Sequence, residues 1–305
     1  MRERTGRWDP VDWAIAAYAG ATAVVLVATG LPGGGWWMLA TRVGVFAALL
    51  LLPPRGAAWE SRAWEEPVPR RTIWGAGVLL RYGWPLLAAL FFFQEVPGIL
   101  SALWGEPPWW FEPHLLRAER ALFGRPGVAG WPTAAVEAVY ATYLVAYYPV
   151  VAGGLLYAAT SGGERDGRPG AAFGPALAGT VFAFLASLAL FLALPARAPR
   201  HIPELAADLP DPPRAVFVPV VEWIQGLGGV LGGAFPSAHV AVAWGLVVGL
   251  SRHRPRAAAL LVALAVGLAL ATPLTPYHHA LDAVAGAAVG VVAGALARRF
   301  DGGSG

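Results

Sequence analysis

Three short segments of this chain carry side chains suited to acid–base chemistry or to phosphate binding. They are residues 197–201 (Arg-Ala-Pro-Arg-His), residues 235–239 (Phe-Pro-Ser-Ala-His) and residues 277–282 (Tyr-His-His-Ala-Leu-Asp). Each segment borders a long apolar stretch. Polar side chains in or beside such stretches cost free energy and are therefore candidates for a functional site.

In the segment 235–239, Pro236 and Ser237 are typical of the first positions of a helix. The free N–H groups of a first helical turn attract anions, phosphate included. His239 would stand in the same turn, where an imidazole can give or take a proton. The alternative is an ordinary helix cap followed by a histidine at the membrane interface.

In the segment 277–282, His278 and Asp282 are four residues apart and would share one face of a helix. A carboxylate in that position can hold one imidazole nitrogen and leave the other free as a nucleophile. An apolar environment strengthens the pair. The alternative is a buried aspartate satisfied by a neighbouring histidine at a helix start.

In the segment 197–201, Arg197 and Arg200 follow an apolar stretch directly. Planar guanidinium groups bind phosphate oxygens through two parallel hydrogen bonds. The alternative is a pair of arginines that snorkel to the headgroup level. Taken together, an arginine site, a Ser-x-His and a His-x-x-x-Asp would form a phosphate pocket with a nucleophile and an acid.

The composition indicates the elements that must position these residues. Of the 305 residues, 57% are apolar and 13% are charged, whereas an average soluble domain is about a quarter charged. Apolar runs of roughly 20 residues recur, each long enough to cross a bilayer. This pattern excludes a soluble enzyme, a disordered chain, a coiled coil and a membrane β-barrel. The chain has no cysteine, which excludes disulfides and zinc sites built on Cys.

We expect an all-α polytopic membrane bundle of about eight transmembrane helices, a six-helix core plus an N-terminal two-helix hairpin. The expected spans are 11–31, 36–53, 82–103, 131–158, 172–195, 237–251, 257–273 and 278–297. The hairpin and an interfacial segment make up residues 1–71, the catalytic membrane domain 72–301, and residues 302–305 resemble an added tail. The first apolar run is longer than a signal-peptide core, so we expect an uncleaved helix.

The arginines predict the orientation. All 22 basic residues are arginine, and the net charge is only +3 without a basic stripe, so we expect no nucleic-acid partner. With the N-terminus inside, 15 arginines lie in cytoplasmic segments and 6 on the other side, which places both termini in the cytoplasm. The two long connections, 104–130 and 196–236, are then extracytoplasmic, and 215–231 is expected to lie along the interface. Arg42 is expected to snorkel to the outer face, and Glu95 and Glu137 to pair across helices.

The order of these motifs resembles the type 2 phosphatidic acid phosphatase superfamily, whose soluble relatives include vanadium haloperoxidases. In that superfamily a loop arginine, Pro-Ser-x-His and His-x-x-x-Asp follow one another around membrane helices. The resemblance covers residues 82–298 and rests on Pro-Ser-Ala-His at 236–239 and on His278, Asp282 and Gly286. It implies a membrane enzyme that acts on a lipid phosphate or diphosphate.

The chain departs from the common form of the superfamily, because it has no lysine, Arg200 is followed by His201, and Ala271 and Thr272 replace a Ser-Arg pair. It resembles instead the divergent branch that contains inositol phosphorylceramide synthases. Residues 118–124 and four tyrosines carry weaker signals of the same branch: Tyr140, Tyr143, Tyr147 and Tyr148. That branch contains phosphotransferases as well as phosphatases, so the acceptor is either water or an alcohol such as inositol.

The motifs and the resemblance together predict a mechanism at the outer face. His278 attacks phosphorus, Asp282 orients His278, and His239 serves as acid and then base. Arg200 and Ser237 bind the phosphate with Arg197 as second cation, and His201, His279 and Tyr277 are candidates for substrate contact. We expect no metal and no cofactor, since these side chains supply the charge that magnesium supplies elsewhere.

Two rival functions belong to other classes. A proton-coupled transporter would use Glu95, Glu137 and Asp282 as a relay and would carry polar residues at mid-membrane depth in several helices. A haem or metal protein would use the three histidines His239, His278 and His279. The polar residues cluster instead at helix ends on one face, which favours the enzyme.

Overall fold

A computed structural model describes residues 9–30, 35–51, 68–106, 108–124, 127–160, 172–207 and 212–300. Within these residues the chain is helical and forms no strand, apart from one isolated bridge between Ala196 and Gly233. The expected interfacial segment after the second span lies largely outside the described residues, and so do residues 302–305. The expected domain boundary after residue 71 falls inside α4, which begins at Val68.

The helices agree with the expected membrane class. Among the described residues, five helices are long and apolar enough to cross a membrane: α1 (Pro10–Ala28), α7 (Thr133–Thr160), α8 (Phe173–Ala193), α12 (Pro255–Ala271) with its continuation η2 (Thr272–Leu274), and α13 (Ala280–Phe300). A sixth candidate is the bent pair α4 (Val68–Gln94) and α5 (Val96–Trp104). Two further apolar helices are shorter, α2 (Gly35–Leu51) and α11 (Ala238–Ser251).

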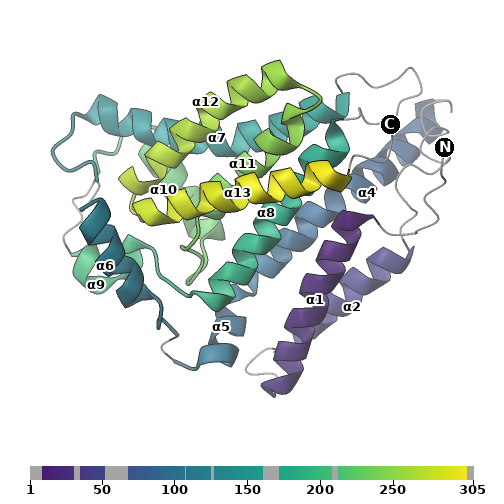
Figure 1. The fold of residues 1–305 in the computed structure, drawn as a ribbon, viewed down its shortest axis with the longest axis horizontal. Helices are drawn as coiled ribbons and strands as arrows, with labels where there is room; N and C mark the ends of the chain where they lie inside the picture. The colour runs from purple at the N-terminus through teal and green to yellow at the C-terminus, as the bar shows by residue number, and fades with distance from the viewer. Residues whose placement is uncertain are drawn as a thin grey trace.

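Helices α8, α11 and α13 pack against one another in the middle of the bundle (Figure 1). Glycines permit the close approach. A Cβ added to Gly179 of α8 would lie 2.3 Å from the carbonyl oxygen of Gly245 in α11, and a Cβ on Gly290 of α13 would lie 2.3 Å from the Ala241 oxygen. Small residues at such crossings allow membrane helices to associate through backbone contact, and here they bring the starts of α11 and α13 together.

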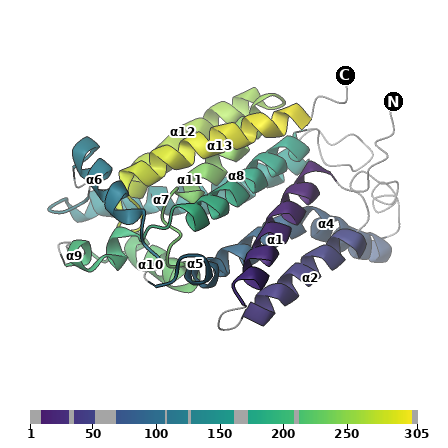
Figure 2. The ribbon, with the colours of Figure 1, turned by 60° about the horizontal axis from the view of Figure 1, so that its bottom comes forward.

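The N-terminal hairpin of α1 and α2 lies beside α4 and α5 (Figure 2). Buried ion pairs join it to them: Arg42 of α2 pairs with Glu95, and Asp12 of α1 pairs with Arg81 at 2.6 Å. The prediction that Arg42 snorkels is therefore wrong, because its side chain is 3% exposed and its guanidinium bonds to Glu95 and Thr22 between helices. Glu95 sits where α4 and α5 bend by 48°, and the nearby Pro97 lacks the N–H that a continuous helix would use.

Four short elements from the two long connections gather at one end of the bundle, where α11 and α13 begin (Figures 1 and 2). They are α6 (Glu112–Leu122), η1 (Pro199–His201), α9 (Pro203–Ala206) and α10 (Phe217–Gly228). The last turn of α13 lies at the opposite end. The three polar segments, which the sequence was expected to place on one face of the membrane, therefore lie at the same end of the bundle.

Candidate active site

The starts of α11 and α13 are joined directly by their backbones. Ser237 is the N-cap of α11, as the sequence predicted, and its N–H donates to the carbonyl of Asp282 at 2.8 Å. One turn further along α13, a Cβ on Gly286 would lie only 2.5 Å from the Ser237 carbonyl oxygen. This close crossing places the His239 and His278 rings 5.6 Å apart between centroids.

His278 is held through one ring nitrogen. Its Nδ1 lies 3.3 Å from Asp282 Oδ2 and 3.1 Å from the carbonyl oxygen of Ala234, so two acceptors fix the proton on Nδ1. Nε2 then carries the free lone pair, with Ser237 Oγ at 3.5 Å. The side chain of His278 is 5% exposed. Burial lowers the pKa of His278 to about 4, the hydrogen bond to Ala234 opposes the shift, and the charge of Arg200 adds to it.

Asp282 reaches His278 in a different way from the one expected. The helix begins at Ala280, so His278 precedes it and the two residues do not share a helical face. Asp282 is instead the third residue of α13, and its Oδ2 accepts the N–H of His279 at 2.8 Å, as an acidic residue in a capping box does. The same oxygen contacts His278 Nδ1, so the cap and the histidine pair use one carboxylate.

Glu119 of α6 completes the start of α13. Its carboxylate accepts the N–H of Ala280 at 2.8 Å and the N–H of Leu281 at 3.0 Å. The first N–H groups of a helix have no partner within it, and in a buried setting they need one from elsewhere. In the sequence, the segment around Glu119 stands out only by its resemblance to the divergent branch, and no local pattern indicates a contact between residues this far apart.

His239 stands in the first turn of α11 among aromatic rings from α7. Its Nε2 lies 3.5 Å from the Tyr143 hydroxyl, and its ring packs edge-on against Tyr147 at 4.4 Å between centroids. Gln225 of α10 donates to the Tyr143 hydroxyl at 3.1 Å. Two of the four tyrosines that the sequence associated with the divergent branch, Tyr143 and Tyr147, therefore contact one of the two paired histidines.

Arg200 occupies a fixed position in η1. Its N–H donates to the carbonyl of Pro276 at 3.1 Å, and its guanidinium lies over the Tyr277 ring, 4.6 Å from the centroid. Its buried Nε has no hydrogen-bond partner within the described residues. The pKa of Tyr277 is raised to about 12, chiefly by burial and against the charge of Arg200. Arg200 therefore presents an unused donor beside His278.

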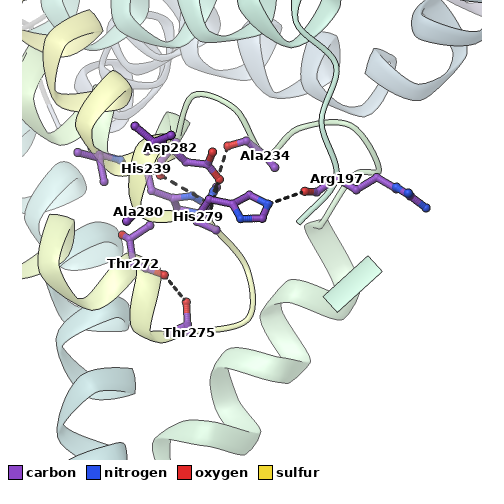
Figure 3. A network of polar contacts seen from close by, with 12 residues as sticks. Arg197, Ala234, His239, Thr272, Thr275, His279, Ala280 and Asp282 are labelled. Carbon is purple, nitrogen blue, oxygen red and sulfur yellow. Dashed lines mark hydrogen bonds and ion pairs between the residues drawn. The ribbon is translucent and has the colours of Figure 1, made fainter. Parts of the chain in front are cut away.

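Arg197 does not join this group. Its Nη2 pairs with Glu112 Oε1 at 2.7 Å, its Nε donates to Glu112 Oε2 at 2.9 Å, and this ion pair raises the pKa of Arg197. In Figure 3 the Arg197 side chain extends away from His239 and Asp282, and only its backbone carbonyl faces the His279 ring, at 3.3 Å from Nε2. The expectation that Arg197 is the second phosphate cation does not fit this geometry, because the Nε and Nη2 donors of its guanidinium already bond to Glu112.

His201 also lies apart. Its backbone carbonyl accepts from Arg197 Nη1 at 3.3 Å, and its side chain is half-buried. Burial lowers the pKa of His201, and the charges of Arg200 and Arg197 lower it further. The structure places Tyr277 and His279, but not His201, among the residues that line the adjacent cavity.

That cavity has a volume of about 600 Å³, within the range of small-molecule sites. Its lining includes His278, His279, Arg200, Tyr277 and Arg120. Ser237 and His239 are not among its lining residues. The volume exceeds the need of a single phosphate group, so a headgroup or a second reactant has room beside it.

The acids of the transporter hypothesis have separate partners. Glu95 bonds Arg42 and Thr41, whereas Glu137 accepts the N–H groups of Ala215 and Val216, each at 3.1 Å, before α10. Asp282 holds the start of α13. As for the metal hypothesis, no group of three or more metal-binding side chains converges within the described residues.

Comparisons with protein-family models, curated proteins and solved structures find no match to this chain.

Proposed function

We propose that this protein is a membrane enzyme of the type 2 phosphatidic acid phosphatase superfamily that transfers a phosphoryl group of a lipid phosphate or diphosphate. The observation that carries the proposal is the state of His278, whose Nδ1 is held by Asp282 and Ala234, whose Nε2 has only the distant Ser237 Oγ beside it at 3.5 Å, and which lines a cavity together with Arg200. A nucleophile with an orienting carboxylate is the general arrangement of covalent catalysis.

In the first step, Nε2 of His278 attacks phosphorus and the bond from phosphorus to the leaving oxygen breaks. The electron pair goes to that oxygen, which takes a proton from His239, and His278 becomes a phosphohistidine. Asp282 stabilises the positive charge on the ring. In the second step, His239 takes the proton of the acceptor hydroxyl, the acceptor oxygen bonds to phosphorus and the N–P bond breaks.

The phosphate oxygens are bound by Arg200, Ser237 and the start of α11. The unused Nε–H of Arg200 suits an oxyanion. The Ser237 side chain accepts only from Val240 N, so no side chain caps the N–H groups of Ala238 and His239 within the described residues. Those of α13 are already bonded to Glu119 and Asp282. A phosphate is therefore expected at α11, where donors aimed at developing charge lower the barrier.

In the membrane, we propose that α2 and α11 cross together with the longer helices, which makes eight spans with both termini cytoplasmic. The excess of arginine on that side supports this orientation. The site then faces the extracytoplasmic side, beside α10. Exposed apolar side chains of α10 and its flanks suit insertion among lipids at the interface: Val216, Val220, Trp223, Leu227 and Leu231.

The acceptor is the open part of the proposal, and the volume of the cavity favours an alcohol such as inositol as the alternative to water. The experiment is a panel of lipid phosphates and diphosphates given to the purified enzyme in detergent, with and without inositol. Release of inorganic phosphate identifies a phosphatase, and formation of an inositol phosphate monoester, the product of phosphoryl transfer to the alcohol, identifies a phosphotransferase. If neither product forms with any lipid, while proton-driven uptake appears in proteoliposomes, the transporter hypothesis replaces this one.

A further inference from the structure

We propose that Arg120 of α6 is the second cation of the substrate site, the role that the sequence suggested for Arg197. This inference rests on the proposed function, because it assumes an anionic substrate in the cavity beside His278. It assigns to Arg120 the binding of an anionic oxygen of the substrate, a phosphate oxygen of either a monophosphate or a diphosphate.

Arg197, the second cation expected from the sequence, could bind a phosphate only by breaking its ion pair with Glu112. Two charge-assisted hydrogen bonds from its fork and a third from its backbone N–H, at 3.1 Å, end on Glu112. That contact fixes the 196–201 loop to α6. Arg197 is therefore a support for the loop that carries Arg200.

The charged side chains that line the cavity differ in whether they already have partners. Four charged side chains line it, and the two acids are already engaged: Glu119 with the backbone of α13, and Glu222 with Arg214 at 3.6 Å. The two cations are Arg120 and Arg200. Arg120 makes no hydrogen bond or ion pair in the described part of the chain, and the Nε of Arg200 is also unused. Among the described lining residues, the uncommitted charges are therefore positive, which favours an anion.

The backbone of Arg120 is held in place by the residue before it. The preceding residue, Glu119, is 5% exposed and is bonded to the start of α13, which begins two residues after His278. The backbone of Arg120 is thereby held at a fixed place relative to the reacting histidine, although its own side chain is exposed. A cation on a fixed support binds at a lower entropic cost than one on a free loop.

The test compares Arg120→Ala with Arg117→Ala. Arg117 is an exposed arginine on the same helix, but it bonds to His114 Nδ1 at 3.0 Å and does not line the cavity. The measurements are kcat/KM on the lipid phosphate that the enzyme turns over and binding of inorganic phosphate and pyrophosphate by calorimetry. Arg120→Ala should lose about tenfold or more in kcat/KM and in anion affinity, the equivalent of one charge-assisted bond. Arg117→Ala should match the wild type.

Arg120→Lys, which keeps the charge, should recover part of the loss, and thermal unfolding of each variant shows whether it has folded. Equal losses in Arg120→Ala and Arg117→Ala would overturn the inference, because they would reflect surface charge alone. So would wild-type affinity in Arg120→Ala, or a wild type that binds neither anion. If Arg120→Ala matches the wild type while His278→Ala is inactive, the inference fails and the proposed function stands. If no lipid phosphate is turned over, the proposed function fails. The calorimetric affinity of Arg120→Ala for phosphate and pyrophosphate, compared with that of the wild type, then tests whether Arg120 binds an anion.

Discussion

The carboxylate of Glu119 accepts the N–H groups of both Ala280 and Leu281, at 2.8 and 3.0 Å. An amphipathic helix outside the bundle thereby supplies the cap of a membrane helix. Because α13 begins two residues after His278, the position of the proposed nucleophile depends on this contact. Glu112, seven residues earlier on the same helix, holds the loop that leads to Arg200. Helix α6 therefore contacts both the start of α13, next to His278, and the loop that carries Arg200.

We predict that Glu119→Ala lowers both stability and turnover. The substitution leaves two buried N–H groups without an acceptor, at about 1–3 kcal/mol for each unsatisfied group. Glu119→Gln keeps one acceptor oxygen and should be milder. Thermal unfolding in detergent and kcat are the measurements, and Glu106→Gln, at an exposed position, is the control. An unchanged melting temperature in Glu119→Ala would show that water replaces the cap.

The second prediction concerns the nucleophile. His278→Ala should abolish turnover while the protein still folds, because the proposed covalent intermediate forms on its Nε2. Asp282→Asn should also be severe, since it removes the charge that supports the imidazolium. Turnover is measured beside expression and thermal stability, because Asp282 also caps α13. Activity of His278→Ala within about tenfold of the wild type would exclude His278 from that role, since one decade is only 1.36 kcal/mol.

These contacts mark the limit of what the sequence could predict. Apolar runs predicted the helices, because burial in lipid acts on every residue of a span, and Pro236-Ser237 predicted the start of α11 because a cap is a local signal. The contacts of Glu119, Glu112 and Ala234 depend on the fold, and no spacing encodes them. The same reason explains why two expectations do not fit the structure. Arg42 was expected at the outer face and Arg197 at the phosphate, but each arginine pairs with a carboxylate that is distant in the sequence.

The third prediction tests the close crossing of α11 and α13. In Gly286→Ala the new Cβ would lie 2.5 Å from the Ser237 carbonyl oxygen, which is backbone and cannot rotate away. The helices must separate, at a cost of about 1–3 kcal/mol typical of overpacking. We expect a lower melting temperature and a lower kcat. Gly20→Ala in α1 is the control, because open space surrounds that position, and it should be neutral or slightly stabilising.

The fourth prediction concerns orientation in the membrane. The native chain has no cysteine, so single-cysteine labelling starts without background. An impermeant thiol reagent should label Arg214→Cys in intact cells and should label Arg254→Cys only after permeabilisation. Both positions lie outside the apolar helices, so labelling reports the side of the membrane. The opposite pattern would overturn the arginine-based topology and would place the site in the cytoplasm.

The last prediction separates phosphate binding from membrane anchoring at Arg200. If Arg200 only anchors the loop, Arg200→Lys keeps the charge and should barely change activity. If its planar fork binds phosphate over the Tyr277 ring, lysine cannot supply two parallel hydrogen bonds or the Nε–H that Arg200 leaves unused. A lost charge-assisted bond is worth about 1.5–3 kcal/mol, so kcat/KM should fall about ten- to a hundredfold.

Arg197→Lys is the matched variant three residues away. It should weaken the ion pair with Glu112, so the melting temperature should fall while KM for the lipid phosphate changes little. A near-normal Arg200→Lys beside an Arg197→Lys with a greatly raised KM would mean that the two arginines have the reverse roles. Near-normal kcat/KM in both variants would mean that this loop does not bind the phosphate. The resemblance of the arginine segment to the superfamily would then not indicate a phosphate-binding role.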